Sequence, residues 1–278
     1  YSNGDGTLET GKIKKIKGKY YGFMPDDGRE GAGKMMTGLN LIKVDSATGI
    51  VDDVILDDMD SDDIDDLLDG DYDSYLATGY TLYYFGSDED ADGAMKTGNT
   101  TINLDGDSYQ FLFSKAGGAE SKGKGQTGID DNKYIYKFGM KMKADSEDKY
   151  KVVYATGDTG DDNAVVEEID TAKMRGLAEE ATNKNKDGDT IKYVGSLGSN
   201  FYLVNTSGTI VKNKTAAKDG DDWYFYVENK QIVMYSNNKT LTAETGKPAP
   251  KDVNGVELRK AGDKNVTIDN GTTITLSD

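Results

Sequence analysis

The sequence contains no cysteine and no histidine, and each absence excludes a class of chemistry. Without cysteine there is no disulfide framework, no thiolate nucleophile and no zinc–sulfur or iron–sulfur site. Without histidine, Ser-His and Cys-His catalytic pairs are excluded, together with the commonest general base and metal ligand. Proline is scarce, with 3 residues, and tryptophan occurs once. We therefore expect no cofactor and no catalytic activity in this chain, although a catalytic domain could lie outside it.

Long apolar runs are missing as well. No stretch approaches the roughly 18–20 consecutive apolar residues that span a bilayer, so membrane insertion is not expected. The formal net charge is -17, and an acidic surface repels phosphates, so we expect no nucleic-acid partner. The chain begins at Tyr1 with neither an initiator Met nor a signal-peptide pattern. We interpret it as a mature product or an excised fragment.

Aromatic residues carry much of the apolar content, with 18 Tyr and 7 Phe beside 34 Gly. This mixture favours many short strands joined by glycine turns. One pattern recurs: a turn, a group of aromatics, a Gly-rich polar turn, and a Met or aliphatic residue often followed by Thr-Gly. The clearest copies cover residues 18–38 and 82–98, and looser copies cover 105–128, 132–142, 201–211 and 222–234.

Each copy predicts a β-hairpin, because aromatic and β-branched residues favour strands and Asp-Gly or Asn-Lys turns permit positive φ. A lone two-stranded hairpin is marginal in water, so stacked copies would bury one another's aromatic faces. We therefore predict a mostly β fold, a solenoid of stacked hairpin repeats with two short helical insertions.

The pattern of aromatics, Asp-Gly and Met-x-Thr-Gly resembles the cell-wall-binding or choline-binding repeat of Gram-positive surface proteins. The resemblance implies a hairpin solenoid, export to the cell surface, and non-covalent attachment to choline-bearing teichoic acids, glucans or related wall polymers. In that family a cage of aromatics, largely Trp, holds choline by cation–π attraction. Here the residues after Thr-Gly are Leu39, Asn99 and Ile129, and the single Trp is Trp223. A sugar-stacking face or a purely structural array therefore fits the remaining Tyr and Phe better than a choline cage.

Two insertions and a tail interrupt the repeats. The predicted segments are hairpin repeats at 1–40, 79–144 and 198–246, an acidic insertion with a short helix at 41–78, a second insertion with a helix at 145–197, and a C-terminal β extension at 247–278. In the first insertion Ser61 is the expected N-cap and Gly70 the expected C-terminal glycine. In the second, apolar residues at helical spacing predict a helix over 171–182. In the extension, residues 253–256 and 266–276 read as hairpins with Asn-Gly turns.

Two acidic stretches are candidates for a calcium site. The run at 57–71 lies on a predicted helix, which spreads its acids around the cylinder, whereas calcium needs them to converge from a loop. The segment 183–189 has the opening spacing of an EF-hand loop, but its twelfth position is Val194 instead of a bidentate acid. We therefore predict no metal site. With 50 acidic residues, a suitably spaced carboxylate pair carries no specificity for a glycosidase, and no catalytic residue is predicted.

The predicted function is non-catalytic attachment of an extracellular protein to cell-wall or other surface polysaccharide through aromatic stacking. The alternative is a structural stalk or adhesin-like spacer in which the repeats serve only as scaffold. The expected location is secreted, at the cell surface or in the cell wall, and the sequence leaves the oligomeric state open. The expected ligand contacts are Tyr20, Tyr21, Tyr83, Tyr84, Trp223 and Tyr224.

Overall fold

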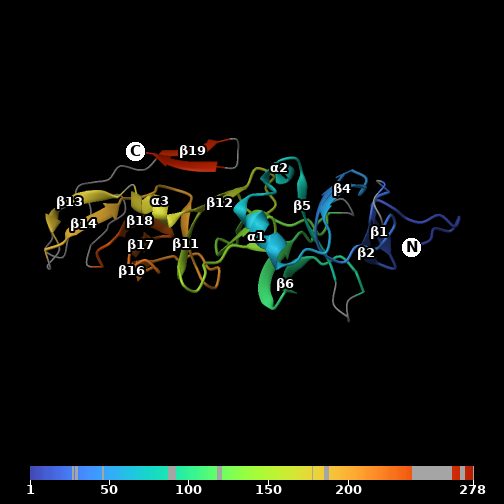
Figure 1. Cartoon of the computed structure of the whole chain (residues 1–278), viewed down its shortest axis with the longest axis horizontal. Coiled ribbons are helices and arrows are strands. Elements are labelled where there is room, and N and C mark those ends of the chain that lie inside the picture. The colour runs from blue at the N-terminus through green and yellow to red at the C-terminus, as the bar shows by residue number, and fades with distance from the viewer. Residues whose placement is uncertain are drawn as a thin grey trace. The chain divides into compact units, whose positions relative to one another are not determined.

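The computed structural model describes residues 1–26, 28, 31–45, 47–86, 92–117, 121–176, 178–184, 188–239, 265–269 and 273–277. The fold is mostly β with a few short helices, and its strands form several antiparallel sheets of two to five strands (Figure 1). The predicted β class is confirmed at this level. The chain divides into unit 1, Tyr1–Gln126 with Tyr136–Lys141, and unit 2, Thr127–Ile135 with Met142–Asp278.

Unit 1 holds the N-terminal strands and two helices. Its elements are β1 (Lys12–Ile16), β2 (Lys19–Phe23), β3 (Gly38–Val44), β4 (Val51–Leu56), α1 (Ser61–Asp69), α2 (Asp73–Leu76), β5 (Tyr80–Phe85), β6 (Gly98–Leu104), β7 (Asp107–Phe113), the end of β9 (Tyr134–Lys137), and β10 (Met140–Lys141). β1 pairs with β2, β3 lies between β4 and β5, and β10 joins β7 to β9.

Successive copies of the repeat in unit 1 are joined through their backbones. The amide of Met95 donates a hydrogen bond to the carbonyl of Tyr20 at 2.8 Å, and the amide of Gly125 donates to that of Leu82 at 2.9 Å. Tyr20 and Leu82 each lie three residues before the Phe that ends their aromatic strand. Equivalent positions of successive copies therefore make equivalent contacts, while the finer solenoid arrangement stays a prediction.

Aromatic packing accompanies these bonds. Gly22 on β2 approaches β5 so closely that an added Cβ would lie 2.6 Å from Cζ of Phe85. Between β5 and β7, the ring of Tyr84 stacks on that of Phe113 with centroids 6.5 Å apart. Stacked aromatics of this kind contribute stability beyond the area they bury. The aromatic strands thus form much of the core of unit 1.

The acidic insertion contains α1, as predicted, but its N-cap is Asp60 instead of Ser61. The Asp60 side chain accepts from the amide of Asp63, and the Asp63 side chain accepts from the amide of Asp60, which makes a reciprocal capping box. The Ser61 hydroxyl is engaged elsewhere, because it donates to Asp105 at 2.9 Å. Gly70 closes the helix in the left-handed conformation, as expected, with φ 93°.

Unit 2 contains two larger sheets and one short helix. Its elements are β8 (Gly128–Asp130), β11 (Tyr150–Thr156), β12 (Val165–Ile169), α3 (Thr171–Gly176), β13 (Glu179–Lys184), β14 (Thr190–Val194), β15 (Phe201–Asn205), β16 (Lys214–Lys218), β17 (Tyr224–Glu228), β18 (Gln231–Ser236), β19 (Asn265–Asp269) and β20 (Thr273–Ser277). β11 lies between β12 and β15, and the order of the five-stranded sheet is β13-β14-β18-β17-β16.

The helix predicted over 171–182 is shorter than expected. α3 ends at Gly176, and residues 179–184 form β13, which pairs antiparallel with β14. The helical prediction for 179–182 is therefore wrong. Glycine disfavours helix continuation, and a strand partner is available to the segment that follows. Cross-strand pairing thus overrides the helical spacing of the apolar residues.

The predicted hairpin around Trp223 is confirmed as β17 and β18. Its two turn residues, Asn229 and Lys230, have φ of 49° and 71°, as a tight turn matched to strand twist requires. The backbone of β19 and β20 forms the hairpin expected within 266–276. Three predicted features lie wholly or partly outside the described residues: the turn at 253–256, the Asn-Gly turn at 270–271, and positions 185–187 of the candidate calcium loop.

Candidate functional site

The six aromatic residues predicted to contact a ligand fall into two groups by burial. Tyr83 and Tyr84 on β5 are only 1% and 6% exposed, so their rings are core residues and present no stacking face to solvent. The other four are half-buried: Tyr20 and Tyr21 on β2, Trp223 just before β17, and Tyr224 at its start. The first four residues belong to unit 1 and the last two to unit 2.

Tyr20 has cationic neighbours on the surface of unit 1. The Nζ atoms of Lys15 and Lys122 each lie 5.7 Å from its ring centroid. Tyr20 also packs against the apolar cluster that contains Phe85. Its ring therefore serves partly as core and partly as a contact for the unit's own lysines.

Trp223 lies at the end of the loop that connects β16 to β17. The side chain of Asp219 folds this loop by accepting hydrogen bonds from the amides of Asp221 at 3.0 Å and Trp223 at 2.9 Å. The amide of Asp219 in turn donates to the carbonyl of Trp223 at 2.9 Å. Short-range bonds of this type are why Asp is favoured in turns, and here they fix the loop backbone that carries the indole.

Tyr235 on β18 packs against the indole of Trp223. Its ring centroid lies 5.0 Å from that of Trp223 and 4.1 Å from that of Phe225, on which it stacks. Its hydroxyl donates to Asp219 at 2.5 Å. Burial, followed by this bond to a carboxylate, raises the pKa of Tyr235 well above its usual range. The phenol therefore stays protonated and holds the loop in place.

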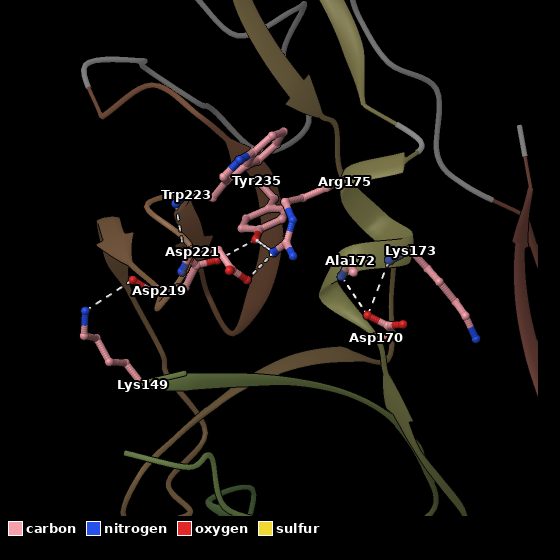
Figure 2. A network of polar contacts seen from close by, with 9 residues as sticks. All are labelled: Lys149, Asp170, Ala172, Lys173, Arg175, Asp219, Asp221, Trp223 and Tyr235. Atoms are coloured by element: carbon pink, nitrogen blue, oxygen red, sulfur yellow. Dashed lines mark hydrogen bonds and ion pairs between the residues drawn. The ribbon is translucent and has the colours of Figure 1, made fainter. Parts of the chain in front are cut away.

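Arg175 from α3 completes the cluster, and Figure 2 shows its guanidinium directed at Tyr235 and Asp221. Nη1 donates to the Tyr235 hydroxyl at 3.1 Å and forms an ion pair with Asp221 at 2.7 Å. Lys149 donates from Nζ to the carbonyl of Asp219 at 3.3 Å. A half-buried guanidinium, an exposed carboxylate and a half-buried indole thus meet at one place in unit 2.

This Trp223 cluster (Arg175, Asp219, Asp221, Trp223 and Tyr235) has the features of a binding surface. The indole is flat, apolar and pre-positioned, while the Arg175–Asp221 pair offers planar donors and acceptors beside it. Such a combination suits a ligand with one apolar face and a rim of hydroxyls. Within the described part of the chain, no group of three acidic residues could hold a metal ion.

The sequence pattern singles out Trp223 but not the residues that surround it in the structure. Asp219 and Asp221 are close in sequence, and their position in an acidic turn just before the only Trp could have marked them. Arg175 and Tyr235 are 60 residues apart and meet through the packing of α3 on the sheet. No local sequence pattern predicts the contact between Arg175 and Tyr235.

No protein-family model and no curated protein sequence matches the chain. A weak structural similarity connects it to a solved structure of CbpJ from Streptococcus pneumoniae TIGR4, with 15% sequence identity over 93% of this chain and 90% of that one. The TM-score is 0.19, which is too low to support a functional argument. Among the described residues, no helix is long and apolar enough to span a membrane.

Proposed function

We propose that the chain is a non-catalytic binding module that attaches an extracellular protein to cell-wall or other surface polysaccharide. One observation carries the proposal: the half-buried indole of Trp223 is fixed on the Tyr235 ring, beside the Arg175–Asp221 ion pair. A sugar ring would stack its C–H face on the indole, and its hydroxyls would hydrogen-bond the guanidinium and the carboxylate.

The charge of the protein favours an uncharged polymer. With a net charge of -17, the chain repels polyanions at long range, whereas a neutral glycan meets no such barrier. Tyr224, next to Trp223, and Tyr20 and Tyr21 on β2 are the remaining predicted contacts with partly exposed rings. Tyr83 and Tyr84 act in this proposal as the packed support of β5.

The hairpin solenoid belongs to the same proposal. Its support is the pair of matching hydrogen bonds that link Met95 to Tyr20 and Gly125 to Leu82. Repeated contacts between equivalent positions are the defining property of a solenoid, since each unit then buries the face of its neighbour. A stacked array would present its binding residues on a rigid support, outside the cell or in its wall.

A structural stalk is the second candidate. The burial of Tyr83 and Tyr84 favours it, because aromatic residues of the repeats that pack only against one another would build a spacer without binding anything. The two candidates differ in what they require of Trp223. A binding module needs the exposed face of its indole, whereas a stalk does not.

Retention on insoluble polysaccharides tests the proposal. The full chain is incubated with peptidoglycan, α-glucan and β-glucan, with free choline as a competitor, and the bound fraction is measured. We expect retention on at least one neutral polymer, loss of most of it in Trp223→Ala, and recovery in Trp223→Phe, which restores a flat apolar ring. Tyr1→Ala, which removes an exposed ring from unit 1, is the matched control and should bind normally.

Retention on none of the polymers would contradict binding and favour the stalk. Retention that Trp223→Ala leaves unchanged would show that the site lies elsewhere. Release by choline would show a quaternary-ammonium site in place of the sugar-stacking face.

A further inference from the structure

A second aromatic surface lies in unit 1 where the acidic insertion ends and β5 begins, far from the Trp223 cluster in sequence. Three tyrosines from α2 and its flanks form it: the ring centroids of Tyr72 and Tyr75 are 6.4 Å apart, and those of Tyr75 and Tyr80 are 5.5 Å apart with an edge-on contact. Tyr75 is 39% exposed, whereas Tyr72 and Tyr80 are half-buried. Figure 1 shows α2 beside β5, the strand that Tyr80 begins. We call these three residues the tyrosine face.

Carboxylates surround the tyrosine face. The hydroxyl of Tyr80 donates to Asp53 at 2.8 Å, and this bond, then burial, raises the pKa of Tyr80. Burial and the negative charges of Asp63, Asp66 and Asp71 likewise raise the pKa of Tyr72. Both phenols therefore stay neutral at physiological pH, and the carboxylates that raise their pKa values would attract a cation.

One ring of the face already carries a cation. Nζ of Lys43, on β3, lies 5.7 Å from the ring centroid of Tyr80, which is the geometry of a cation–π contact. Tyr75 is the most exposed of the three rings, and no lysine or arginine of the described segments lies over it. The Tyr75 ring thus offers a partner the same cation–π contact that the Tyr80 ring already makes with Lys43.

We propose that the tyrosine face docks a basic segment of a partner protein, with a lysine or arginine side chain over Tyr75 and others paired with the surrounding carboxylates. Charge complementarity selects this occupant. An anionic lipid surface or an acidic protein would be repelled, because the carboxylates of Asp53, Asp63, Asp66 and Asp71 act on these rings. They outnumber the Lys43 ammonium that lies over Tyr80. This inference does not depend on polysaccharide binding, because Tyr72, Tyr75 and Tyr80 are not among the predicted sugar contacts.

The test uses the full chain and a fluorescently labelled peptide of alternating lysine and glycine, with binding followed by fluorescence anisotropy at low salt. Tyr75→Ala should weaken binding about three- to fivefold, the range expected for one cation–π contact, and Tyr75→Phe should restore it. Asp53→Asn should also weaken binding, since it removes a charge that borders the face.

Two matched controls distinguish peptide binding at the tyrosine face from non-specific attraction to an acidic protein. Tyr1→Ala removes a tyrosine of similar exposure outside the face, and Asp162→Asn removes one exposed charge from unit 2. Both should bind the peptide as the parent chain does. Equal losses in Tyr75→Ala and Tyr1→Ala, or in Asp53→Asn and Asp162→Asn, would overturn the proposal. Displacement of the peptide by an equal concentration of tetramethylammonium would also overturn it, because the face would then be a site for small cations.

Discussion

Asp219 is 4% exposed and organises three neighbours through one carboxylate. Its Oδ1 accepts from the amides of Asp221 and Trp223, and its Oδ2 accepts from the Tyr235 hydroxyl. A buried carboxylate is tolerated only when its oxygens are satisfied in this way. The position of the indole at the surface therefore depends on a phenol in the core.

Removal of that phenol hydroxyl tests this dependence. Tyr235→Phe keeps the stacked ring but leaves Oδ2 of Asp219 without its donor, so we expect the free energy of unfolding to fall by about 1–3 kcal/mol at neutral pH. Urea unfolding measures the change. Tyr1→Phe removes the hydroxyl of an exposed tyrosine and should stay within about 0.5 kcal/mol of the parent. The pH dependence gives a second readout: the raised pKa of Tyr235 means that the unfolded chain releases this proton at a lower pH than the folded chain.

The raised pKa of Tyr235 determines how the free energy of unfolding changes with pH. Stability from the protonated phenol is fully present below the ordinary tyrosine pKa of about 10 and is lost as the pH rises beyond it. The difference in unfolding free energy between the parent chain and Tyr235→Phe should therefore shrink above that pH. A difference that stays constant from neutral to alkaline pH would contradict the assigned hydrogen bond.

At the scale of elements, β2 and β5 meet at Gly22, where a methyl group would overlap the Phe85 ring. Gly22→Ala forces Phe85 to move within a packed core, and we expect a loss of about 1–3 kcal/mol in urea unfolding. Gly4→Ala is the matched control, because an added Cβ there meets nothing within 4 Å. Equal unfolding midpoints for the two variants would show that the strands can separate at no cost, against the close packing described here.

The elements that sequence patterns predict well are those with local causes. The hairpin of β17 and β18 follows from an aromatic run and a turn with two positive-φ residues, and α1 follows from its acidic start and Gly70. The spacing of apolar residues predicts a longer α3 than the structure has, because it cannot anticipate the pairing of β13 with β14. The predicted N-cap differs from the observed one by one residue. Asp60 and Ser61 are both good caps, and only the reciprocal bond with Asp63 decides between them.

In the candidate sites too, the sequence predicts features with local causes but not those that depend on tertiary contacts. Trp223 stands out in the sequence as the single Trp within a hairpin, but its partners Arg175 and Tyr235 reach it through tertiary packing. Tyr83 and Tyr84 share the aromatic pattern of a stacking strand, and burial on both faces of β5 could not be read from that pattern. The tyrosine face was not predicted, because its three rings come from a helix and its flanks and do not repeat.

For the molecule as a whole, the two candidate surfaces differ in chemistry. The Trp223 cluster in unit 2 combines an indole with an ion pair, which suits an uncharged glycan. The tyrosine face in unit 1 combines partly exposed rings with several neighbouring acids, which suits a basic protein segment. A net charge of -17 is compatible with both ligands and disfavours polyanions.

The fluorescence of Trp223 tests the central claim most directly, because the chain has no other tryptophan. Soluble fragments of the polysaccharide that retains the chain are titrated into the protein while the indole emission is recorded. Stacking of a sugar on the half-exposed ring should shift the emission to shorter wavelength and saturate, and Arg175→Gln should weaken the apparent affinity. Emission that stays unchanged while the fragments bind would show that the ligand does not contact Trp223 and would contradict the account.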